Sequence, residues 1–264
     1  MLVMKKILTI VLALTAFVCE AQRTMFGAQN NYVVPVTANQ GAIVTGGLVL
    51  DLDAANSSSY AGSGTSWLDA SGANNHCTLY NSTLFTPTLP TYFSFNGSNQ
   101  YAKSNAALSL GIASNNAMSA EGWIYTSFNS YDFWFTSNVN TGDCTYRFGT
   151  DGSGHLFWDM GQHNDRNYAG FSIANNTWNY VVFTAGLEAG TIVTRIYVNG
   201  NLITTQNEGI TTLPNTNEYF VGTGESSNSH NFSGRIGIVR IFNRALTAQE
   251  VSQNFNAVKS RFGL

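Results

Sequence analysis

Short runs of β-branched and aromatic residues, separated by glycine, asparagine and serine, fill the chain from residue 46 to residue 243. The clearest runs lie at 48–52, 92–95, 131–135, 180–184 and 192–198, and between them stand turn pairs such as Asn96-Gly97, Asp151-Gly152 and Asn199-Gly200. Runs of this length bounded by turn residues are typical of strands. Many short strands without helical periods between them predict an all-β sandwich or barrel.

One helix is predicted at the end of the chain. Thr247 and Glu250 have the spacing of a capping box, in which the hydroxyl and the carboxylate each accept a hydrogen bond from a backbone N–H group. Val251, Phe255 and Val258 follow at helical spacing. They form one apolar stripe, which predicts a helix that packs against the sandwich.

The first 21 residues have the pattern of a cleavable secretory signal. Two lysines precede an apolar run over 7–18, and the small residue Ala21 offers a cleavage point. The run is shorter than the ~20 residues that cross a membrane, so no membrane insertion is expected. The chain is therefore expected to be secreted, to the extracellular space or, in a bacterium, to the periplasm or cell surface. The predicted organisation is a signal peptide (1–21), a lead-in (22–45) and one β-sandwich domain (46–264).

The charge of the chain argues against nucleic-acid binding. The full chain has 12 Lys and Arg against 15 Asp and Glu, a formal charge of −3. Cleavage after Ala21 removes Lys5, Lys6 and Glu20, which leaves 10 basic and 14 acidic residues and a charge of −4. No cluster of Lys and Arg stands out, so the surface that neutralises phosphates is missing.

Two cysteines remain after cleavage, Cys77 and Cys144. In an oxidising compartment they can pair in a disulfide. They can equally be buried free thiols that act as small hydrophobic side chains. The sequence leaves the two alternatives open, since a disulfide requires that the Cα atoms lie close together.

Four blocks of sequence carry a resemblance to a known family. They read LVLDLDA (48–54) with WLDASG (67–72) and NNHCTL (74–79); FNGSNQY (95–101) with MSAEGWI (118–124); WNYVVFT (178–184) with IYVNG (196–200); and GRIGIVRIFNRAL (234–246) with the closing helix. In order and spacing the chain resembles the concanavalin A-like lectin/glucanase superfamily, specifically the bacterial laminin-G-like (LamG) domains. The resemblance implies a two-sheet antiparallel jelly-roll β-sandwich with one short C-terminal helix.

Within these blocks, most of the large side chains are expected to be structural. Trp123 and Trp178 lie in apolar strands, where large aromatic residues usually supply core area. Arg240 and Arg244, in and just after a β-branched strand, are expected to form a hydrogen-bonded brace rather than a binding site.

The catalytic pattern of the glucanases in this superfamily is absent. Those enzymes resemble one another in a Glu-x-Asp-x-x-Glu strand motif, which brings two carboxylates to the separation that retaining hydrolysis needs. None of the glutamates here has an aspartate at that spacing; they are Glu20, Glu121, Glu188, Glu208, Glu218, Glu225 and Glu250. There is also no Gly-x-Ser-x-Gly elbow and no Cys/His cluster with zinc spacing. The protein is therefore expected not to be an enzyme.

Relatives in the laminin-G and pentraxin groups often hold Ca²⁺ with loop oxygens, many with an aspartate in the second block. This chain has Asn96, Asn99 and Gln100 there, and Ca²⁺ sites normally need carboxylates. No cofactor is therefore expected. A calcium site elsewhere stays an alternative, with the carboxylates of Asp51, Asp53, Asp151 or Asp159.

The stretch from Tyr131 to Tyr168 is the best candidate for a ligand site, because it combines aromatic rings with polar side chains. Sugar recognition uses this chemistry: rings stack on C–H faces, and Asp, Asn, His and Arg bind hydroxyls. The predicted carbohydrate-binding residues are Trp134, His155, Trp158, Asp159, His163, Asp165 and Tyr168. Strand alternation puts both tryptophans outside if the neighbouring phenylalanines face inward; the alternative is that both tryptophans fill the core.

These features favour a secreted, non-catalytic, lectin-like module. Its expected partner is a polysaccharide or the glycan of a glycoprotein. The main alternative is a structural or adhesion protein that uses the sandwich to contact a protein partner or a second copy of itself. A third alternative is a glycoside hydrolase with diverged catalytic residues.

Overall fold

The computed structural model describes residues 41–106, 110–127, 131–140, 143–160, 167–216, 218–224 and 230–264. The predicted signal peptide (1–21) and most of the lead-in (22–45) lie outside these ranges. In the described part of the chain, no helix is long and apolar enough to cross a membrane.

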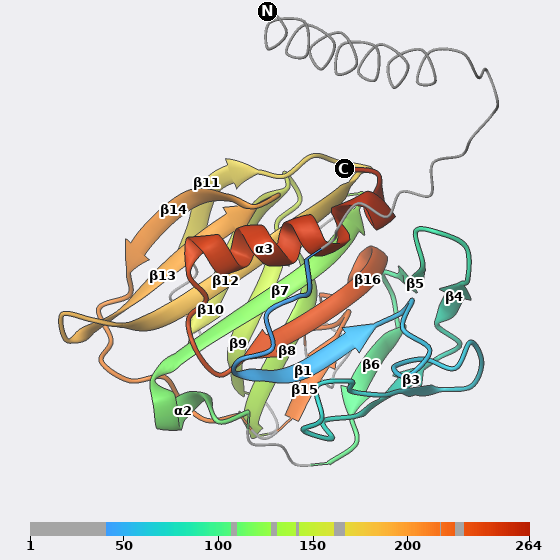
Figure 1. Ribbon diagram of the computed structural model, residues 1–264, viewed down its shortest axis with the longest axis horizontal. Helices are drawn as coiled ribbons and strands as arrows, with labels where there is room; N and C mark the ends of the chain where they lie inside the picture. Colours follow the sequence, from blue (N-terminus) through green and yellow to red (C-terminus); the bar gives the residue numbers. More distant parts are fainter. Residues whose placement is uncertain are drawn as a thin grey trace, which may run out of the picture. The chain divides into compact units, whose positions relative to one another are not determined.

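Two antiparallel sheets pack face to face, which confirms the predicted all-β sandwich (Figure 1). Sheet A has the order β14-β13-β12-β7-β16-β5-β4, with β1 also paired to β16. Its strands are β1 (Leu48–Asp53), β4 (Leu84–Thr86), β5 (Tyr92–Asn96), β7 (Ala117–Thr126), β12 (Trp178–Glu188), β13 (Thr191–Val198), β14 (Asn201–Asn207) and β16 (Ser233–Phe242).

Sheet B has the order β11-β10-β9-β8-β15-β6-β3-β2. Its strands are β2 (Ser66–Trp67), β3 (Cys77–Tyr80), β6 (Tyr101–Ser104), β8 (Asp132–Asn140), β9 (Asp143–Thr150), β10 (His155–Met160), β11 (Asn167–Ser172) and β15 (Glu218–Val221). The helical elements are α2 (Ile112–Asn115), α3 (Ala248–Val258) and the 3₁₀ turn η1 (Lys259–Phe262). The short helix predicted at the C-terminus is α3.

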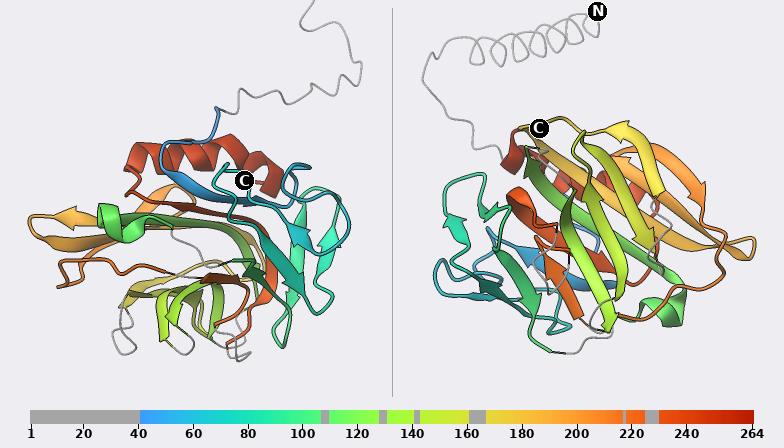
Figure 2. Two further views of the ribbon diagram at one scale, coloured as in Figure 1. Left: turned by 90° about the horizontal axis from the view of Figure 1, so that it is seen from below. Right: turned by 180° about the vertical axis from the view of Figure 1, so that it is seen from behind.

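The central strands of sheet A, β7, β12 and β16, are buried on both faces over most of their length. On β12, Val181 and Phe183 pack into the core between the sheets, while the alternating Tyr180 and Val182 face the other way. That outer face is covered by α3, which lies across sheet A (Figure 2, left).

Trp123 is the centre of the contact between sheet A and the C-terminal helical segment. Its ring stacks on Phe262 at a centroid distance of 4.2 Å and on Phe255 at 5.8 Å, with interplanar angles of 10° and 9°. Trp178 packs against Phe262 as well. Both tryptophans are therefore structural, as predicted, but they fill a layer beneath α3 rather than the space between the sheets.

The capping box predicted at the start of α3 is present. Thr247 Oγ1 accepts a hydrogen bond from the backbone N–H of Glu250, and the Glu250 carboxylate accepts one from the backbone N–H of Thr247. Arg244 adds two hydrogen bonds to the same carboxylate, at 2.7 and 2.9 Å. The hydrogen bonds from Arg244 lower the pKa of Glu250 from 4.5 to about 2.

Glu250→Gln is expected to remove part of the acid sensitivity of the fold. As the pH falls, the unfolded chain takes up a proton at pH 4.5 while the folded carboxylate stays charged down to about 2. The stability that this carboxylate contributes is therefore fully present above pH 4.5 and is lost as the pH falls toward 2. Glutamine keeps the capping box but loses the ion pair, at a cost of about 1 kcal/mol at neutral pH.

Urea unfolding at several pH values between 7 and 2 measures this effect. Glu188→Gln is the matched control, because Glu188 pairs with Arg195 at an exposed position. An exposed pair contributes little, so this control is expected to change stability by less than about 0.5 kcal/mol. Equal acid sensitivity of Glu250→Gln and the wild type would show that the Arg244–Glu250 pair does not stabilise the fold.

The last residues of the predicted lead-in contact α3. The backbone N–H of Val44 donates to Asn254 Oδ1 at 2.7 Å, and Gln253 Nε2 donates to the carbonyl of Ala42 at 2.7 Å. Ile43 and Val44 also pack on the apolar layer beneath the helix. The segment from residue 41 is thus packed against the domain that follows it.

Cys77 is a buried free thiol. Burial raises its pKa to about 12, so that it is not a reactive thiolate at neutral pH. Cys144 lies on β9, four strand positions from β3 in the order of sheet B. Four spacings of about 4.8 Å place the two Cα atoms roughly 19 Å apart, far beyond the reach of a disulfide. The geometry of the sheet therefore decides against pairing of these two cysteines.

The outer face of sheet B differs from that of sheet A. No helix covers it within the described ranges, and Figure 2 (right) shows it from that side. On this face β3 and β6 lie on one flank, and β9, β10 and β11 on the other. The stretch that the sequence singled out for ligand binding, β8 to β11, makes up half of this sheet.

Candidate functional site

The two predicted stacking tryptophans are in the wrong place for a ligand. Trp134 and Trp158 have 0% of their surface exposed and belong to the core between the sheets. A ring that stacks on a sugar must present a face to solvent, so the prediction that these residues bind carbohydrate is wrong. The alternative interpretation, that both fill the core, is correct.

Strand alternation explains this correction. Phe133 and Phe157 lie on the outer face of sheet B, and the tryptophan that follows each of them points inward. A bulge between Phe133 and Phe135 shifts the register of β8, so that Phe135 joins Trp134 in the core. The phenylalanine that precedes each tryptophan is therefore on the outer face, whereas Phe135, which follows Trp134, is in the core.

Trp158 has a structural partner at the edge of the sandwich. Its Nε1 donates to Glu208 Oε1 at 2.9 Å, and Glu208 Oε2 accepts from Asn167 Nδ2. Asn167 Oδ1 in turn accepts from Gln206 Nε2 on β14. These hydrogen bonds join the edge strands of the two sheets, β14 and β11, at one end of the sandwich.

Asp159 does lie on the outer face of sheet B, but it is paired. Its Oδ2 is 3.3 Å from Nη1 of Arg147 on the adjacent strand β9, and both side chains are buried. The Arg147 guanidinium also lies over the ring of Phe133, with Cζ 5.8 Å from the ring centre. Asp159 is thus one half of a buried ion pair beside an aromatic ring.

Aromatic residues gather next to this ion pair. Phe133 and Phe157 make an edge-to-face contact at 5.2 Å, and Tyr131 packs against Phe157 at 5.6 Å. The ring of His230 packs edge-to-face on Phe133 at 5.3 Å. Tyr131 is partly exposed and His230 is exposed, whereas the two phenylalanines are buried. We call the six residues Tyr131, Phe133, Arg147, Phe157, Asp159 and His230 the β8–β10 cluster.

The remaining predicted residues have different outcomes. The His155 side chain is 42% exposed, and its Nδ1 lies 2.9 Å from Asp151 Oδ2. Asp151 also accepts from the backbone N–H groups of Ser153 and His155, which closes the turn between β9 and β10. His163 and Asp165 lie outside the described residues. Tyr168 lies opposite Phe157 in the β10–β11 register, and its side chain is outside the description.

The alternation of residues along the strands predicts part of the β8–β10 cluster. Because adjacent strand residues face opposite ways, Trp158 and Asp159 cannot both belong to one surface. Alternation instead places Asp159 on the same face as Phe157. It also places Arg147 on the outer face, because its neighbours Tyr146 and Phe148 face the core. No signal in the sequence places His230, which comes from a segment almost a hundred residues after Tyr131.

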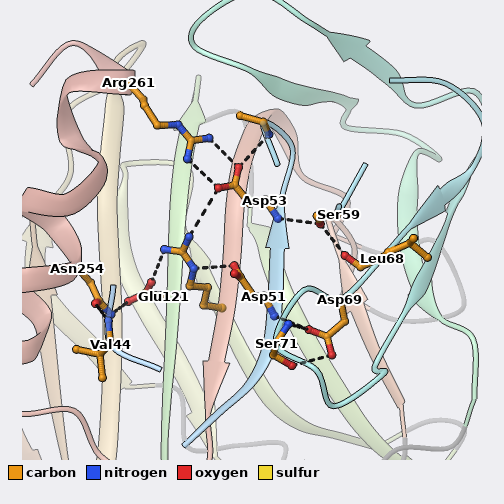
Figure 3. Close-up of polar contacts among 12 residues, drawn as sticks. Val44, Asp51, Asp53, Ser59, Leu68, Asp69, Ser71, Glu121, Asn254 and Arg261 are labelled. Atoms are coloured by element: carbon orange, nitrogen blue, oxygen red, sulfur yellow. Dashed lines mark hydrogen bonds and ion pairs between the residues drawn. The ribbon is translucent and has the colours of Figure 1, made fainter. Parts of the chain in front are cut away.

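A second group of charged residues lies on the outer face of sheet A, beneath α3 (Figure 3). Arg240 Nε donates to Asp51 Oδ1 at 2.7 Å, and Nη1 donates to Glu121 Oε1 at 3.1 Å. Arg261 donates two hydrogen bonds of 2.7 Å to Asp53. Burial raises the pKa of Asp51 although the charge of Arg240 opposes it. Burial also acts to raise the pKa of Asp53, but the hydrogen bonds and charge of Arg261 outweigh it and lower that pKa.

Glu121 connects this group to the helix. Its Oε2 accepts from the Tyr180 hydroxyl at 2.6 Å and from Asn254 Nδ2 on α3 at 3.0 Å. Arg240 is therefore a brace between strands, as predicted, and Arg244 has a similar role because it bonds to Glu250 and to the carbonyl of Gly46. The carboxylates Asp51, Asp53 and Glu121 are buried beneath the helix and do not line an open cleft.

The loop that holds an aspartate in many relatives is closed by its own backbone. Asn96 Oδ1 accepts hydrogen bonds from the N–H groups of Ser98, Asn99 and Gln100, at 2.9, 3.0 and 3.3 Å. The hydrogen bonds of this oxygen are therefore made within the turn. Among the residues that the structure describes, no group of three or more His, Cys, Asp or Glu side chains is arranged to hold a metal ion.

The sequence of the chain matches the model of a known family. The family Laminin_G_3, described as the concanavalin A-like lectin/glucanases superfamily, matches residues 96–252, more than half of the chain. No curated protein matches the chain.

Solved structures with this fold include receptor-binding domains of toxins. The binding domain of botulinum neurotoxin DC in complex with rat synaptotagmin II superposes with a TM-score of 0.61 at 18% identity, over 80% of this chain and 52% of that one. A botulinum neurotoxin type C structure, reported with cell entry dependent on two ganglioside molecules, gives a TM-score of 0.60 at 17% identity, over 80% and 51%.

An enzyme shares the fold as well. Trypanosoma rangeli sialidase in complex with sialic acid superposes with a TM-score of 0.63 at 15% identity, over 84% of this chain and 34% of that one. The chain thus spans about half the length of the toxin domains and a third of the sialidase, and at these identities the likeness shows the fold alone. Fold, sequence blocks and family match agree: the chain belongs to the laminin-G-like family of the concanavalin A-like lectin/glucanases superfamily.

Proposed function

We propose that the protein is a secreted, non-catalytic, lectin-like module that binds extracellular or surface glycans through the outer face of sheet B. The observation that carries this proposal is the β8–β10 cluster. Its partly exposed Tyr131 and exposed His230 lie beside a buried charged pair, on a face that no helix covers within the described ranges. Rings of this kind stack on the C–H faces of sugars, and neighbouring polar groups bind the hydroxyls.

The ligands of structural neighbours support a glycan as the ligand. One toxin structure is reported for its dependence on gangliosides, and the sialidase was solved with sialic acid. These ligands belong to proteins of which a large part has no counterpart in this chain. They therefore support the class of ligand and not its identity.

The carboxylates support a binding role rather than hydrolysis. Most glycoside hydrolases use two carboxyl groups on either side of a bound sugar. In the described chain Asp51, Asp53 and Glu121 are buried under α3 and held by arginines, and Asp159 is paired with Arg147. Turnover of a polysaccharide by the purified protein would favour a diverged hydrolase instead.

One observation favours protein contact as a second candidate function. A neighbour with the same fold was solved in complex with a protein, rat synaptotagmin II. A stable complex with a purified protein, or a stable oligomer, without any response to glycans would favour this role.

Tyr131→Ala and His230→Ala are expected to weaken glycan binding about five- to tenfold each. A stacking contact contributes about 1 kcal/mol, and 1.4 kcal/mol is a factor of ten in affinity. The ligand is first identified on a glycan array with the wild-type protein, and the dissociation constants of the variants are then measured by calorimetry.

The control variant is Leu202→Ala, which truncates an exposed apolar side chain on β14 of sheet A. It is expected to bind as the wild type does, and thermal melting checks that all variants are folded. Wild-type affinity in both Tyr131→Ala and His230→Ala would exclude the β8–β10 cluster as the binding site. Absence of any glycan binding by the wild-type protein would overturn the proposed function.

A further inference from the structure

A second aromatic patch lies on the outer face of sheet B, on strands that the sequence did not single out. Tyr80 on β3 and Tyr101 on β6 are directly paired in the backbone register. Their rings stack in parallel, with centroids 4.9 Å apart and an interplanar angle of 11°. Tyr80 is 39% exposed and Tyr101 is partly exposed. We call these two residues the tyrosine pair.

The tyrosine pair is not part of the hydrophobic core. The residues that alternate with it, Leu79 and Ala102, pack between the sheets, so the tyrosines face outward. The short strand β2 pairs only with Cys77 and Thr78, which leaves Tyr80 beyond its end. Within the described chain neither tyrosine hydroxyl has a hydrogen-bond partner. Rings exposed in this way are available to a ligand.

One ion pair lies near the tyrosine pair on the same face. Lys103 Nζ is 2.7 Å from Glu218 Oε2, and it also lies 5.2 Å from the ring centre of Phe220. The Tyr101 ring packs against Phe220 at 6.4 Å. The pair therefore combines exposed rings with a donor and an acceptor, which is the chemistry already found at the β8–β10 cluster.

One row of paired residues connects the two patches. In backbone register it runs Thr78, Lys103, Phe220, Thr136, Arg147 and Asp159, across β3, β6, β15, β8, β9 and β10. Lys103 and Arg147 are three strand spacings apart, about 14 Å. The middle of the row, Phe220 and Thr136, is buried. The two patches are thus separate places on one face, and a ligand must be long to reach both.

Charge indicates what kind of ligand fits. Lys103 is compensated by Glu218 in one patch, and Arg147 by Asp159 in the other. The whole chain has a formal charge of −3. A polyanion would meet repulsion and no uncompensated lysine or arginine in either patch. Neutral hydroxyls can instead use both members of the partly exposed Lys103–Glu218 pair, whereas the Arg147–Asp159 pair is buried.

We propose that the tyrosine pair, with Lys103 and Glu218, is a second sugar subsite on the outer face of sheet B, and that this face binds an extended, uncharged polysaccharide. This inference rests on the proposed function and names its substrate class. Occupation of both subsites by one polymer raises the affinity, because the second contact becomes intramolecular. A single terminal sugar can occupy only one subsite.

Affinity electrophoresis tests the inference with soluble polysaccharides in native gels. The neutral probes are β-glucan, xylan and galactomannan, and the carboxylated probes are alginate and polygalacturonate. The wild-type protein is expected to be retarded by at least one neutral polymer and by neither carboxylated one. Tyr80→Ala/Tyr101→Ala is expected to weaken that retardation about tenfold or more, whereas Tyr80→Phe/Tyr101→Phe keeps most of it because the rings remain.

Tyr80→Ala alone is the second variant, because its exposed side chain can be truncated without loss of the fold, and thermal melting confirms this. Unchanged retardation of the folded variants would overturn the second subsite and leave the proposed function intact. Retention by the carboxylated polymers would overturn the substrate class. Binding only to short glycans on the array would overturn the extended ligand, and binding to no glycan at all would overturn the proposed function as well.

Discussion

Arg240→Met is expected to destabilise the folded protein by about 3–5 kcal/mol. The arginine is buried and bonds to both Asp51 and Glu121. Its removal leaves two buried carboxylates without their cation, while Asp53 keeps Arg261. For a chain of this size the loss corresponds to a fall in Tm of roughly 10–15 °C.

The pH dependence of this variant gives a second readout. Burial already raises the pKa of Asp51, and loss of the Arg240 charge raises that pKa further, so the folded chain binds a proton more readily than the unfolded chain. The cost of burying this charge is therefore present at neutral pH and is relieved as the pH falls toward about 5. Arg240→Met is expected to regain stability over this range, and urea unfolding at pH 7 and pH 5 measures it.

Two further variants separate charge from packing. Arg240→Met/Asp51→Asn/Glu121→Gln removes the uncompensated charges and is expected to recover most of the loss. Arg195→Met removes an exposed ion pair with Glu188 and is expected to cost less than about 1 kcal/mol. If Arg240→Met were no less stable than Arg195→Met, the network beneath α3 would not be the brace that its geometry indicates.

Trp134→Ala is expected to cost about 3–5 kcal/mol, because it opens a large cavity in the centre of the sandwich. The indole packs against Phe148 and Phe183 with ring centroids 5.8 and 6.1 Å away. It also fills the space above Gly122 on the opposite sheet, where a Cβ atom would approach the ring to 3.0 Å. Denaturant unfolding measures the loss, and Trp134→Phe is expected to lose less because its ring refills part of the cavity.

The same variant distinguishes a core residue from a binding residue. Below its Tm, folded Trp134→Ala is expected to bind glycans with wild-type affinity. Phe171→Ala is the control for stability, since Phe171 is an exposed aromatic residue on β11. This substitution is expected to change the free energy of unfolding by less than about 0.5 kcal/mol. A Trp134→Ala protein that kept its stability and lost glycan affinity would contradict the buried position of this ring.

The fold was largely predictable because its signals are local. The capping box at Thr247 and Glu250 and the hairpin turn at Asn199-Gly200 each depend on residues a few positions apart, and both occur where the pattern predicts them. The same holds for the strands, whose apolar runs and turn residues lie within short windows. The buried role of Trp123 followed from its apolar strand, although not its position beneath the helix.

The candidate site was predictable only in its location. The stretch from β8 to β11 does form part of sheet B and of its outer face, but Trp134 and Trp158 lie on the inner face of that sheet. Which face of a strand is inward depends on its register with neighbours and on bulges such as the one after Phe133, and both are tertiary features.

The sequence by itself thus determined the class of fold, the C-terminal helix, the absence of the glucanase motif and the structural roles of Arg240 and Arg244. Only the tertiary structure decided which aromatic rings are exposed, that His230 joins Tyr131, and that Tyr80 and Tyr101 stack on the same face. It also decided that β3 and β9 hold Cys77 and Cys144 too far apart to pair. The physical reason is common to these cases: strand elements form from neighbouring residues, whereas a surface on a sheet is assembled from strands that are distant in the chain and adjacent only after folding.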